Sequence, residues 1–447
     1  MLQHTTVDSE RAGSTTITTD VSVLSGAVAT VSVAVVGLGY VGLPTAIALA
    51  AGGARVIGID VNPDRIAAIR SGAVDLLERD ALQLQLMLPH QLQLSCDPAA
   101  IAAADAVIIG VPTPVDKHLI PDLIPLAAAC AQVVKHARAG QTIILTSTSY
   151  VGTTRDLLVG PLESRGLRVG TDVHVAFSPE RINPGDDQVA HRDVPRVVGG
   201  LTPACCRSAA AIVRRTTARV HEVSSPEAAE LTKLFENTFR AVNIALANEF
   251  ANASSALSVD VTEVIDAAAT KPYGFMAFSP GPGVGGHCIP CDPHYLLWQL
   301  RTQRIELPVV ESAMRGIAGR PTQLVARCRE LLGDRGRPMQ GARIAIVGVA
   351  YKAGVEDVRE SPALEIISRL RGLGADVMFV DPFVAAVRLE DGSELRGWQP
   401  QTGIAPLLDL AVLHTRHPGA DLGWLDQVPI VLDATYRAAD VHHRSFV

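Results

Sequence analysis

The chain has 447 residues, which is more than one hydrophobic core normally holds, so its length predicts two or three domains. Hydrophobic residues make up 48% of the chain but aromatic residues only 4%, and this aliphatic composition favours α/β architecture over a β-sandwich. The formal net charge of -7 argues against a nucleic-acid-binding protein, because binding to a phosphate backbone requires a basic surface.

The seven cysteines are scattered and odd in number, which predicts reduced thiols and a cytoplasmic location rather than a disulfide framework. The N-terminal residues lack the basic segment that begins a secretory signal, so we expect none. The apolar run 21–36 is short and interrupted by Ser and Gly, and we therefore expect no membrane segment.

Strands and helices alternate from residue 31 onward. Residues 1–29 have weak periodicity and are predicted to be a disordered extension. Residues 31–60 combine a buried strand, a glycine turn, an alanine-rich helix and a second strand, which is one βαβ unit. Further strands are predicted at 106–111, 142–146 and 173–177. This order predicts an α/β, doubly wound Rossmann-like domain over 30–210.

The turn after the first strand has the GxGxxG pattern of Gly37, Gly39 and Gly42, and Asp60 ends the next strand. Gly37 permits the tight turn, Gly39 lets a pyrophosphate approach the backbone, and Gly42 lets helix and strand pack closely. Asp60 would bind ribose hydroxyls and repel a 2′-phosphate, which predicts NAD rather than NADP. Arg65 lies near enough to weaken that preference. The predicted cofactor contacts here are Gly37, Gly39, Tyr40, Val41, Gly42, Asp60 and Arg65.

Residues 226–251 are rich in helix formers, which predicts a long connecting or dimer-forming helix, and the helical pattern continues through Ala268. A central helical and dimerisation region is therefore predicted over 211–325. Lys233 would stabilise a developing alkoxide if it were buried, with Asn237 donating a second hydrogen bond. The alternative is a solvated polar face. Spacings of three and four place four polar residues on that face: Glu230, Lys233, Asn237 and Arg240.

Residues 271–293 are dense in Pro and Gly, which predicts an irregular loop around Cys288. A zinc site would use Cys288, Cys291 and the neighbouring His and Asp side chains, but no second CxxC or HxxxH pair follows at the required distance, so no metal is expected. A redox dithiol would prefer a thioredoxin-like unit, and an inert loop is a further alternative. We favour nucleophilic attack by Cys288 on an aldehyde, because a thiohemiacetal is a good hydride donor to a nearby NAD.

After Gly341 the βα alternation returns, which predicts a second, smaller Rossmann-like domain over 326–447. Gly348 follows its first strand, but the later glycines of the dinucleotide fingerprint are missing. This lobe is therefore not expected to bind a dinucleotide in the way that the first one does.

Five segments together resemble the UDP-glucose/GDP-mannose dehydrogenase family, and most closely its UDP-N-acetylhexosamine 6-dehydrogenase branch. They are VVGLGYVGLP (35–44), VPTPVD (111–116), SPERINPGD (178–186), TKPYGFMAFSPGPGVGGHCIPCDPHYL (270–296) and VAYKAGVEDVRESPA (349–363). The resemblance implies NAD-dependent, four-electron oxidation of the C6 alcohol of UDP-GlcNAc to the uronate, in surface polysaccharide synthesis. UDP-glucose and UDP-ManNAc remain alternative substrates.

The resemblance also assigns residues. It implies Cys288 as nucleophile, with Lys233, Asn237 and Asp292 as its polar partners, and Glu180 and Thr148 as groups that position water and proton transfer. It places Thr113, Thr148 and Arg359 beside the cofactor, and suggests that a partner subunit supplies the segment after Lys271 in a homodimer. The implied contacts with the UDP-sugar are Glu180, Arg181, Lys233, Asn237, Arg240, Lys271, Tyr273, Gly285 and Lys352.

Two positions depart from the family pattern. Thr146, Ser147 and Thr148 stand where the family commonly has Glu-Ser-Thr, and Cys291 stands where an aliphatic residue is common. Oxidation of Cys288 and Cys291 to a disulfide is a hypothesis for inactivation.

Three other classes of protein are alternatives to a nucleotide-sugar 6-dehydrogenase. A sugar epimerase or dehydratase would have a YxxxK pair, but Thr154 follows Tyr150 at that spacing. A one-step alcohol or hydroxyacid dehydrogenase needs no cysteine, and an NAD-sensing binding protein needs none of the polar partners of Cys288.

Overall fold

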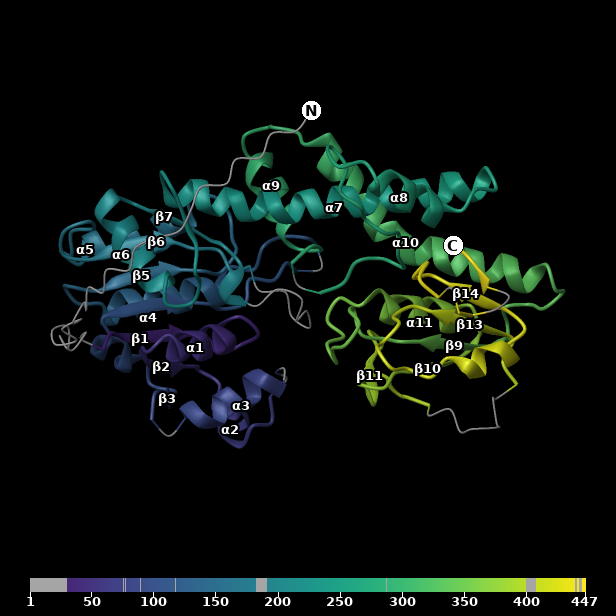
Figure 1. Cartoon of the computed structure of the whole chain (residues 1–447), viewed down its shortest axis with the longest axis horizontal. Coiled ribbons are helices and arrows are strands. Elements are labelled where there is room, and N and C mark those ends of the chain that lie inside the picture. Colours follow the sequence, from purple (N-terminus) through teal and green to yellow (C-terminus); the bar gives the residue numbers. More distant parts are fainter. Residues whose placement is uncertain are drawn as a thin grey trace, which may run out of the picture. The chain divides into compact units, whose positions relative to one another are not determined.

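The computed structural model describes residues 30–74, 76, 78–88, 90–116, 118–181, 191–286, 288–398, 407–438, 440, 441 and 444–447. The predicted disordered extension, 1–29, lies outside the described residues. Residues Val31–Val447 form one compact unit. It contains two α/β lobes and a set of central helices (Figure 1), which confirms the predicted fold class.

The first lobe is built on an eight-stranded sheet in the order β3-β2-β1-β4-β5-β6-β7-β8. All neighbouring strands are parallel except β6 and β7, which are antiparallel. Buried aliphatic residues fill β1, β4 and β5, because helices cover both faces of such a sheet. The strands are β1 (Ser32–Val36), β2 (Arg55–Ile59), β3 (Leu92–Ser95), β4 (Ala106–Ile109), β5 (Thr142–Leu145), β6 (His174–Phe177), β7 (Arg196–Gly200) and β8 (Val220–Val223).

Helices α2 and α6 of the first lobe begin after residues whose side chains accept hydrogen bonds from free N–H groups. Asn62 caps α2 through the N–H of Asp64 at 2.9 Å, and Thr202 caps α6. The domain was predicted to end at residue 210, but strand β8 lies beyond that residue. It follows α6 and pairs with β7 at the edge of the same sheet. The helices are α1 (Gly42–Ala51), α2 (Pro63–Ser71), α3 (Glu78–Met87), η1 (Pro98–Ala103), α4 (Ile124–His136), η2 (Arg155–Val159), α5 (Gly160–Ser164), η3 (His191–Asp193) and α6 (Pro203–Val213).

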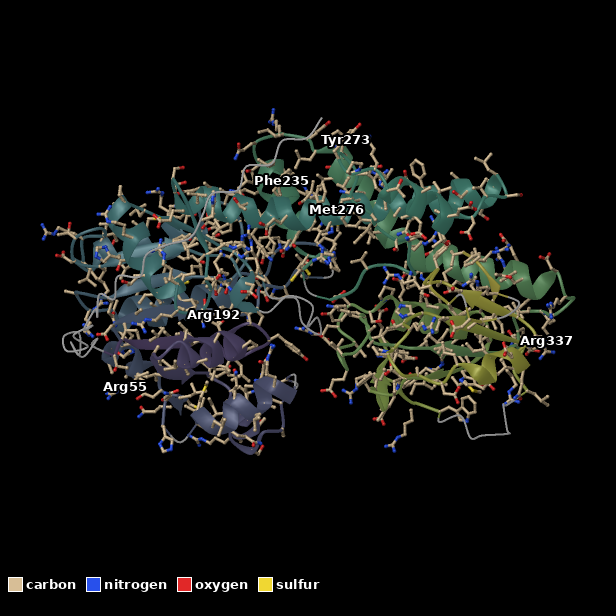
Figure 2. All side chains as sticks on the ribbon, viewed as in Figure 1. Arg55, Arg192, Phe235, Tyr273, Met276 and Arg337 are labelled. Atoms are coloured by element: carbon tan, nitrogen blue, oxygen red, sulfur yellow. The ribbon has the colours of Figure 1, made fainter. Side chains whose placement is uncertain are left out.

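Four helices form the central region: α7 (Pro226–Ala256), α8 (Val261–Ala269), α9 (Asp292–Arg301) and α10 (Pro308–Gly333). The helical pattern predicted through Ala268 breaks after α7, where Ser258 has φ of 56° and Asp260 caps α8. Small residues Ala241 and Ala245 of α7 let α10 pack closely against it. Figure 2 shows Phe235 of α7 and Met276 of the loop after α8, whose side chains are 70% and 64% exposed. None of the described helices is long and apolar enough to cross a membrane.

The second lobe has a parallel sheet in the order β10-β9-β13-β14-β15 and a separate antiparallel hairpin, β11–β12. Its core is aliphatic and centres on β9 and α11, whose N-terminus Ser361 caps. The elements are β9 (Arg343–Val347), α11 (Pro362–Gly372), β10 (Asp376–Val380), β11 (Ala386–Arg388), β12 (Glu394–Arg396), β13 (Leu410–Leu413), η4 (Gly423–Gln427), β14 (Val431–Asp433) and β15 (Arg444–Ser445).

Both lobes use the same turn after their first strand. The carboxylate of Asp60 accepts a hydrogen bond from Leu38 N at 2.9 Å, and that of Asp381 accepts one from Val349 N at 2.7 Å. In the second lobe, however, the ring of His417 covers the carboxylate, with Nε2 3.1 Å from Asp381 Oδ2. Because protein already occupies the place of a ribose, this turn is unsuited to a dinucleotide.

A fully buried arginine, Arg320 of α10, joins the central helices to the loop before Cys288 and to the second lobe. Its guanidinium donates to Gly281 O at 3.0 Å, to Asn252 Oδ1 at 2.8 Å and to Tyr436 Oη at 3.0 Å. Asn248 Oδ1 accepts from Gly281 N at 2.9 Å, so Gly281 is held on both sides. The loop that leads to Cys288 is thus fixed at its base although it has no regular secondary structure.

Candidate active site

The glycine turn between β1 and α1 has two crowded positions and one open one. A Cβ atom on Gly37 would lie 2.6 Å from Gly110 O, and one on Gly42 would lie 1.7 Å from Gly37 O. Gly37 also has φ of 87°, which favours glycine. A Cβ on Gly39 would meet no protein atom within 4 Å. Gly37 and Gly42 are therefore required by packing, whereas the space at Gly39 is free for a ligand.

This turn has the features of a pyrophosphate site. No side chain caps α1 at Val41, so the N-terminal end of the helix remains available to an anion. Asp60 accepts from Leu38 N and Asn62 N, and Arg65 Nε donates to Leu38 O at 2.8 Å. Asp60 and Arg65 thus brace the turn from the end of β2 and from α2.

Four of the predicted catalytic residues meet around the start of α9. Cys288 is exposed in the loop before this helix, and Asp292 N donates to Cys288 O at 2.9 Å. Asp292 is 2% exposed, and Asn237 of α7 donates to its Oδ2. Lys233, one turn earlier on α7, influences the ionisation of both Cys288 and Asp292. The polar face of α7 is therefore turned inward at Asn237, which rules out a wholly solvated face.

Burial and local charge shift the ionisation of this cluster. Desolvation by surrounding protein raises the pKa of the Cys288 thiol, and the Asp292 carboxylate raises it further. Lys233, Arg240 and Arg359 act in the opposite direction and favour the thiolate. Burial raises the pKa of Asp292 to about 6, although Lys233 and the hydrogen bond from Asn237 lower it. Asp292 can therefore exchange a proton near neutral pH.

The loops after β4 and β5 carry Thr113 and Thr148 at the carboxyl edge of the sheet. Tyr295 of α9, which is fully buried, donates to Thr113 O at 3.1 Å. Ser147 Oγ joins the two loops by accepting from Val111 N and donating to Val111 O, both at 2.9 Å. Both threonines thus lie on loops braced from within the site.

Glu180 and Arg181 follow β6 and are largely engaged with protein. The Glu180 carboxylate is paired with Arg196, accepts from Arg181 N at 2.8 Å, and lies 3.3 Å from Thr45 Oγ1. Its backbone carbonyl accepts from Lys233 Nζ at 2.8 Å. Glu180 therefore lies beside the cluster, but this arrangement supports a bracing role for its carboxylate; its role in proton transfer stays a prediction.

The glycine segment before Cys288 packs against the second lobe. A Cβ on Gly285 would lie 2.6 Å from Tyr351 Cβ, and Gly286 N donates to Arg359 O at 3.0 Å. Arg359 pairs with Asp357 at 2.6 Å, and its guanidinium stacks 4.1 Å from the ring of Tyr40. These glycines thus have a packing function in addition to the predicted approach to substrate, and Arg359 reaches the cofactor turn.

The remaining predicted substrate contacts are less enclosed. Lys352 is half-buried in the second lobe, and Arg240 is exposed on α7. Lys271 and Tyr273 are exposed, with the ammonium 5.1 Å from the ring centre. Their contact with substrate across an interface between subunits stays a prediction.

The cysteine loop shows no metal-binding arrangement in the part of the chain that the structure describes. His287, one of the side chains considered as a zinc ligand, lies outside that part, as do residues 182–186 of the SPERINPGD segment. Cys291 is buried, and burial raises the pKa of its thiol to about 12. It is therefore a poor nucleophile compared with the exposed Cys288.

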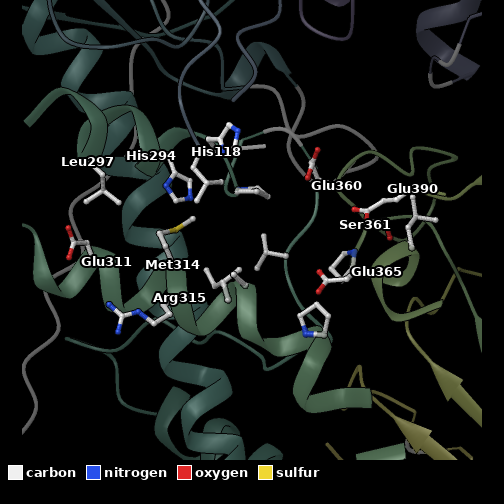
Figure 3. A pocket seen from close by; sticks show the side chains of 18 of the residues that line it. His118, His294, Leu297, Glu311, Met314, Arg315, Glu360, Ser361, Glu365 and Glu390 are labelled. Carbon is white, nitrogen blue, oxygen red and sulfur yellow. The ribbon is translucent and has the colours of Figure 1, made fainter. Parts of the chain in front are cut away.

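A cavity of about 700 Å³ lies on the other side of the loop, between α9, α10 and the start of α11 (Figure 3). Pro290 and His294 line it, and Figure 3 shows Glu360 and Glu365 on the wall across from Arg315. Cys288, Lys233 and Asn237 are absent from the described lining residues. Its volume would suit a small molecule, but the reactive side chains lie elsewhere and define the site.

Sequence comparisons match this arrangement over all three regions of the chain. Residues 31–217 match the NAD binding domain of the UDP-glucose/GDP-mannose dehydrogenase family, residues 227–316 its central domain, and residues 345–434 its UDP binding domain. The chain belongs to the UDP-glucose/GDP-mannose dehydrogenase family. It is an NAD-dependent nucleotide-sugar dehydrogenase, and when NAD is bound it supplies the hydride acceptor.

Individual relatives agree with this assignment. UDP-N-acetyl-D-glucosamine 6-dehydrogenase of Pseudomonas aeruginosa is 36% identical over 390 residues, covering 86% of this chain and 90% of the relative. An NDP-N-acetyl-D-galactosaminuronic acid dehydrogenase of Ralstonia solanacearum is 32% identical, covering 90% and 95%. The solved structure of UDP-D-ManNAc dehydrogenase from Pyrococcus horikoshii has a TM-score of 0.84 at 32% identity, covering 93% and 98%. These relatives differ in their sugars.

Several residues that support the dehydrogenase site were not identified from the sequence. Tyr295 and Gln299 of α9 bind the loops after β4 and β5, and Arg320 and Asn248 hold Gly281. The spacing of Tyr295 and Gln299 from Asp292 places them along the same helix, but their partners are far away in the sequence. Only the fold reveals this role.

We predict that Gly39→Ala weakens NADH binding by about tenfold or more without lowering the melting temperature, because the added methyl group fills ligand space and meets no protein atom. Calorimetric titration with NADH and thermal unfolding would measure the two effects. Gly319→Ala is the matched control, since its Cβ also meets nothing within 4 Å but lies on α10. Unchanged NADH affinity in Gly39→Ala would contradict the proposed place of the pyrophosphate.

Proposed function

We propose that the dehydrogenase oxidises the C6 alcohol of a UDP-N-acetylhexosamine, UDP-GlcNAc first among them, to the uronate with two molecules of NAD. The observation that carries this proposal is the meeting of an exposed cysteine, a buried carboxylate of raised pKa, a buried amide and a lysine at the start of α9. Simple alcohol oxidation needs no such nucleophile.

Bound NAD would serve as the hydride acceptor in two successive oxidations at C6. The C6 alcohol would give up a hydride and a proton to become the aldehyde. The Cys288 thiolate would then add to the aldehyde carbon, and the resulting thiohemiacetal would give up a second hydride to become a thioester. Water would hydrolyse the thioester to the carboxylate and release the thiol. Surface polysaccharide synthesis would use such an acidic nucleotide sugar.

The charges around Cys288 support distinct roles. The ammonium of Lys233 would stabilise the negative oxygen that develops at C6, and Asn237 would donate a second hydrogen bond. Asp292, whose pKa is raised to about 6 by burial, would accept the proton from the attacking water. Thr148 and Glu180 would position water at the cofactor side, and Arg181, Lys352 and Gly285 would contact the sugar nucleotide.

UDP-GlcNAc is preferred to UDP-ManNAc because the Pseudomonas aeruginosa relative at 36% identity is named for that sugar. UDP-ManNAc is the second candidate, since the Pyrococcus horikoshii enzyme of known structure is named for it, and UDP-glucose is a third. Steady-state rates with the three sugars would rank them.

We also propose a homodimer formed through α7. Exposed apolar residues recur at spacings of four and seven along this helix, which places them on one face: Leu231, Phe235, Phe239, Leu246, Phe250 and Leu257. A continuous apolar strip of this kind requires a cover in water, and a second copy of the same strip is complementary to it. Lys271 and Tyr273, in the exposed loop after α8, would then contact the substrate of the partner subunit.

We expect native protein to release two NADH per UDP-GlcNAc consumed, whereas Cys288→Ser stalls before the acid because serine cannot form the thioester. Absorbance of NADH together with chromatographic analysis of the sugar would give the ratio. Cys96→Ser, which changes the other exposed cysteine, should retain the native ratio. One NADH per sugar with an active Cys288→Ser variant would instead indicate a one-step alcohol dehydrogenase.

The dependence of the reaction rate on pH should follow the ionisation of the Asp292 carboxyl group. Its protonated form cannot accept a proton from the attacking water, so the rate of thioester hydrolysis, and with it kcat, should rise with pH through a midpoint of about 6. Because the hydrogen bond from Asn237 lowers the pKa of Asp292, Asn237→Ala should move the midpoint of the acidic limb upward. Residual activity in Asp292→Asn should lack this limb. A midpoint near 4 that is insensitive to Asn237 would contradict this role.

The dimer predicts that Phe235→Glu, which places a charge in the middle of the strip, halves the mass measured by light scattering after gel filtration. Ile124→Glu is the control, because Ile124 is 77% exposed at the start of α4 and lies outside the strip. A native mass equal to one chain, or no effect of Phe235→Glu, would remove the proposal.

A further inference from the structure

Glu230 is a buried carboxylate on α7, close to the reactive cluster but bonded to a different part of the chain. It is 1% exposed and lies one turn before Lys233. Its oxygens accept hydrogen bonds from Gly152 N at 2.6 Å, from Thr154 N at 2.9 Å and from Thr154 Oγ1 at 2.6 Å. A buried carboxylate is stable only when hydrogen bonds satisfy its oxygens, and here these three donors all belong to one loop.

The same loop is bound from a second side by α9. Gln299 Oε1 accepts from Val151 N at 3.0 Å, and Gln299 Nε2 donates to Val151 O at 2.7 Å. The ring of Tyr150 packs edge-on against Trp298, with centroids 5.9 Å apart. Residues 150–154 are therefore held between α7 and α9, the two helices that also carry Asn237 and Asp292.

The position of this loop in the sheet indicates what it can contact. It follows β5, which pairs with β4, whereas the glycine turn and Asp60 belong to β1 and β2. A doubly wound sheet binds one half of a dinucleotide on each side of its first strand. Because Asp60 marks the adenosine half, the nicotinamide half falls over the loops after β4 and β5, where Thr113 and Thr148 lie.

We propose that Glu230 is a positioning residue for the nicotinamide half of NAD, acting through the loop 148–154. It touches neither cofactor nor substrate. Its hydrogen bonds keep the loop in place relative to α7 and α9, and so keep the hydride acceptor aligned with the carbon held at Cys288. The alignment with Cys288 rests on the proposed function, but the effect on cofactor binding does not.

The test compares two ligands in Glu230→Gln. Glutamine offers one acceptor oxygen, and its NH₂ group faces backbone N–H donors that the carboxylate had satisfied. We expect the affinity for NADH to fall by about tenfold. ADP carries the adenosine and both phosphates but no nicotinamide, and its affinity should remain unchanged. Calorimetric titration of the native chain and the variant with each ligand measures both.

Variants at two further positions test whether the hydrogen bond between Glu230 and Thr154, rather than neighbouring contacts, supports NADH binding. Thr154→Val removes the hydroxyl donor and should lower the affinity for NADH. Thr154→Ser keeps the hydroxyl and should bind NADH with the affinity of the native chain. Glu227→Gln is the matched control on the same helix, because Glu227 forms a partly exposed ion pair with Arg155, next to Thr154. It should leave the affinity for both ligands unchanged.

The proposal would be overturned if Glu230→Gln lost affinity for NADH and ADP equally, or if it bound NADH as tightly as the native chain does. If Glu230→Gln does not fold, the Thr154 pair decides, and equal NADH affinity in Thr154→Val and Thr154→Ser would overturn it. None of these titrations requires turnover. A native chain that oxidises no UDP-sugar would therefore disprove the proposed function while leaving the result for Glu230 intact.

Discussion

Helix α9 is bound at three points along its length, and the rest of the site depends on those bonds. Asn237 holds Asp292 at its start, Tyr295 binds Thr113 O in the next turn, and Gln299 binds both backbone groups of Val151 further along. The helix begins four residues after Cys288. A single helix therefore fixes the buried carboxylate of Asp292 and the loops that carry Thr113 and Val151 relative to one another, next to Cys288.

Basic side chains surround Cys288 although the protein as a whole is acidic. Lys233, Arg240 and Arg359 all act on the thiol of Cys288, yet they come from α7 and from the second lobe. Arg359 also stacks on Tyr40 in the cofactor turn. Positive charge is thus concentrated around Cys288 and the cofactor turn, while the chain as a whole has a net charge of -7. The glycines before Cys288 make this possible, because Gly285 has room for no side chain against Tyr351.

The two lobes show how one turn can serve two purposes. Gly37 with Asp60, and Gly348 with Asp381, close the same hydrogen-bonded turn after the first strand of each sheet. In the first lobe the turn leads directly into α1, whose end is uncapped by any side chain, so a pyrophosphate can be bound. In the second lobe His417 covers Asp381, and the turn is part of the core. Family membership assigns that lobe to UDP binding, which must use other surfaces.

The sequence alone determined the α/β class, the dinucleotide turn, the polar face of α7 and the irregular loop around Cys288, because each depends on short spacings that follow directly from local geometry. It did not distinguish a solvated face from a buried one: Glu230 and Asn237 are buried, whereas Arg240 is exposed. Nor did it reveal that Glu230 binds Thr154, or that Tyr295 binds Thr113, pairs that are 76 and 182 residues apart. The tertiary structure decided these, since the partner of a buried polar group is set by which strand ends and helices meet in the folded chain.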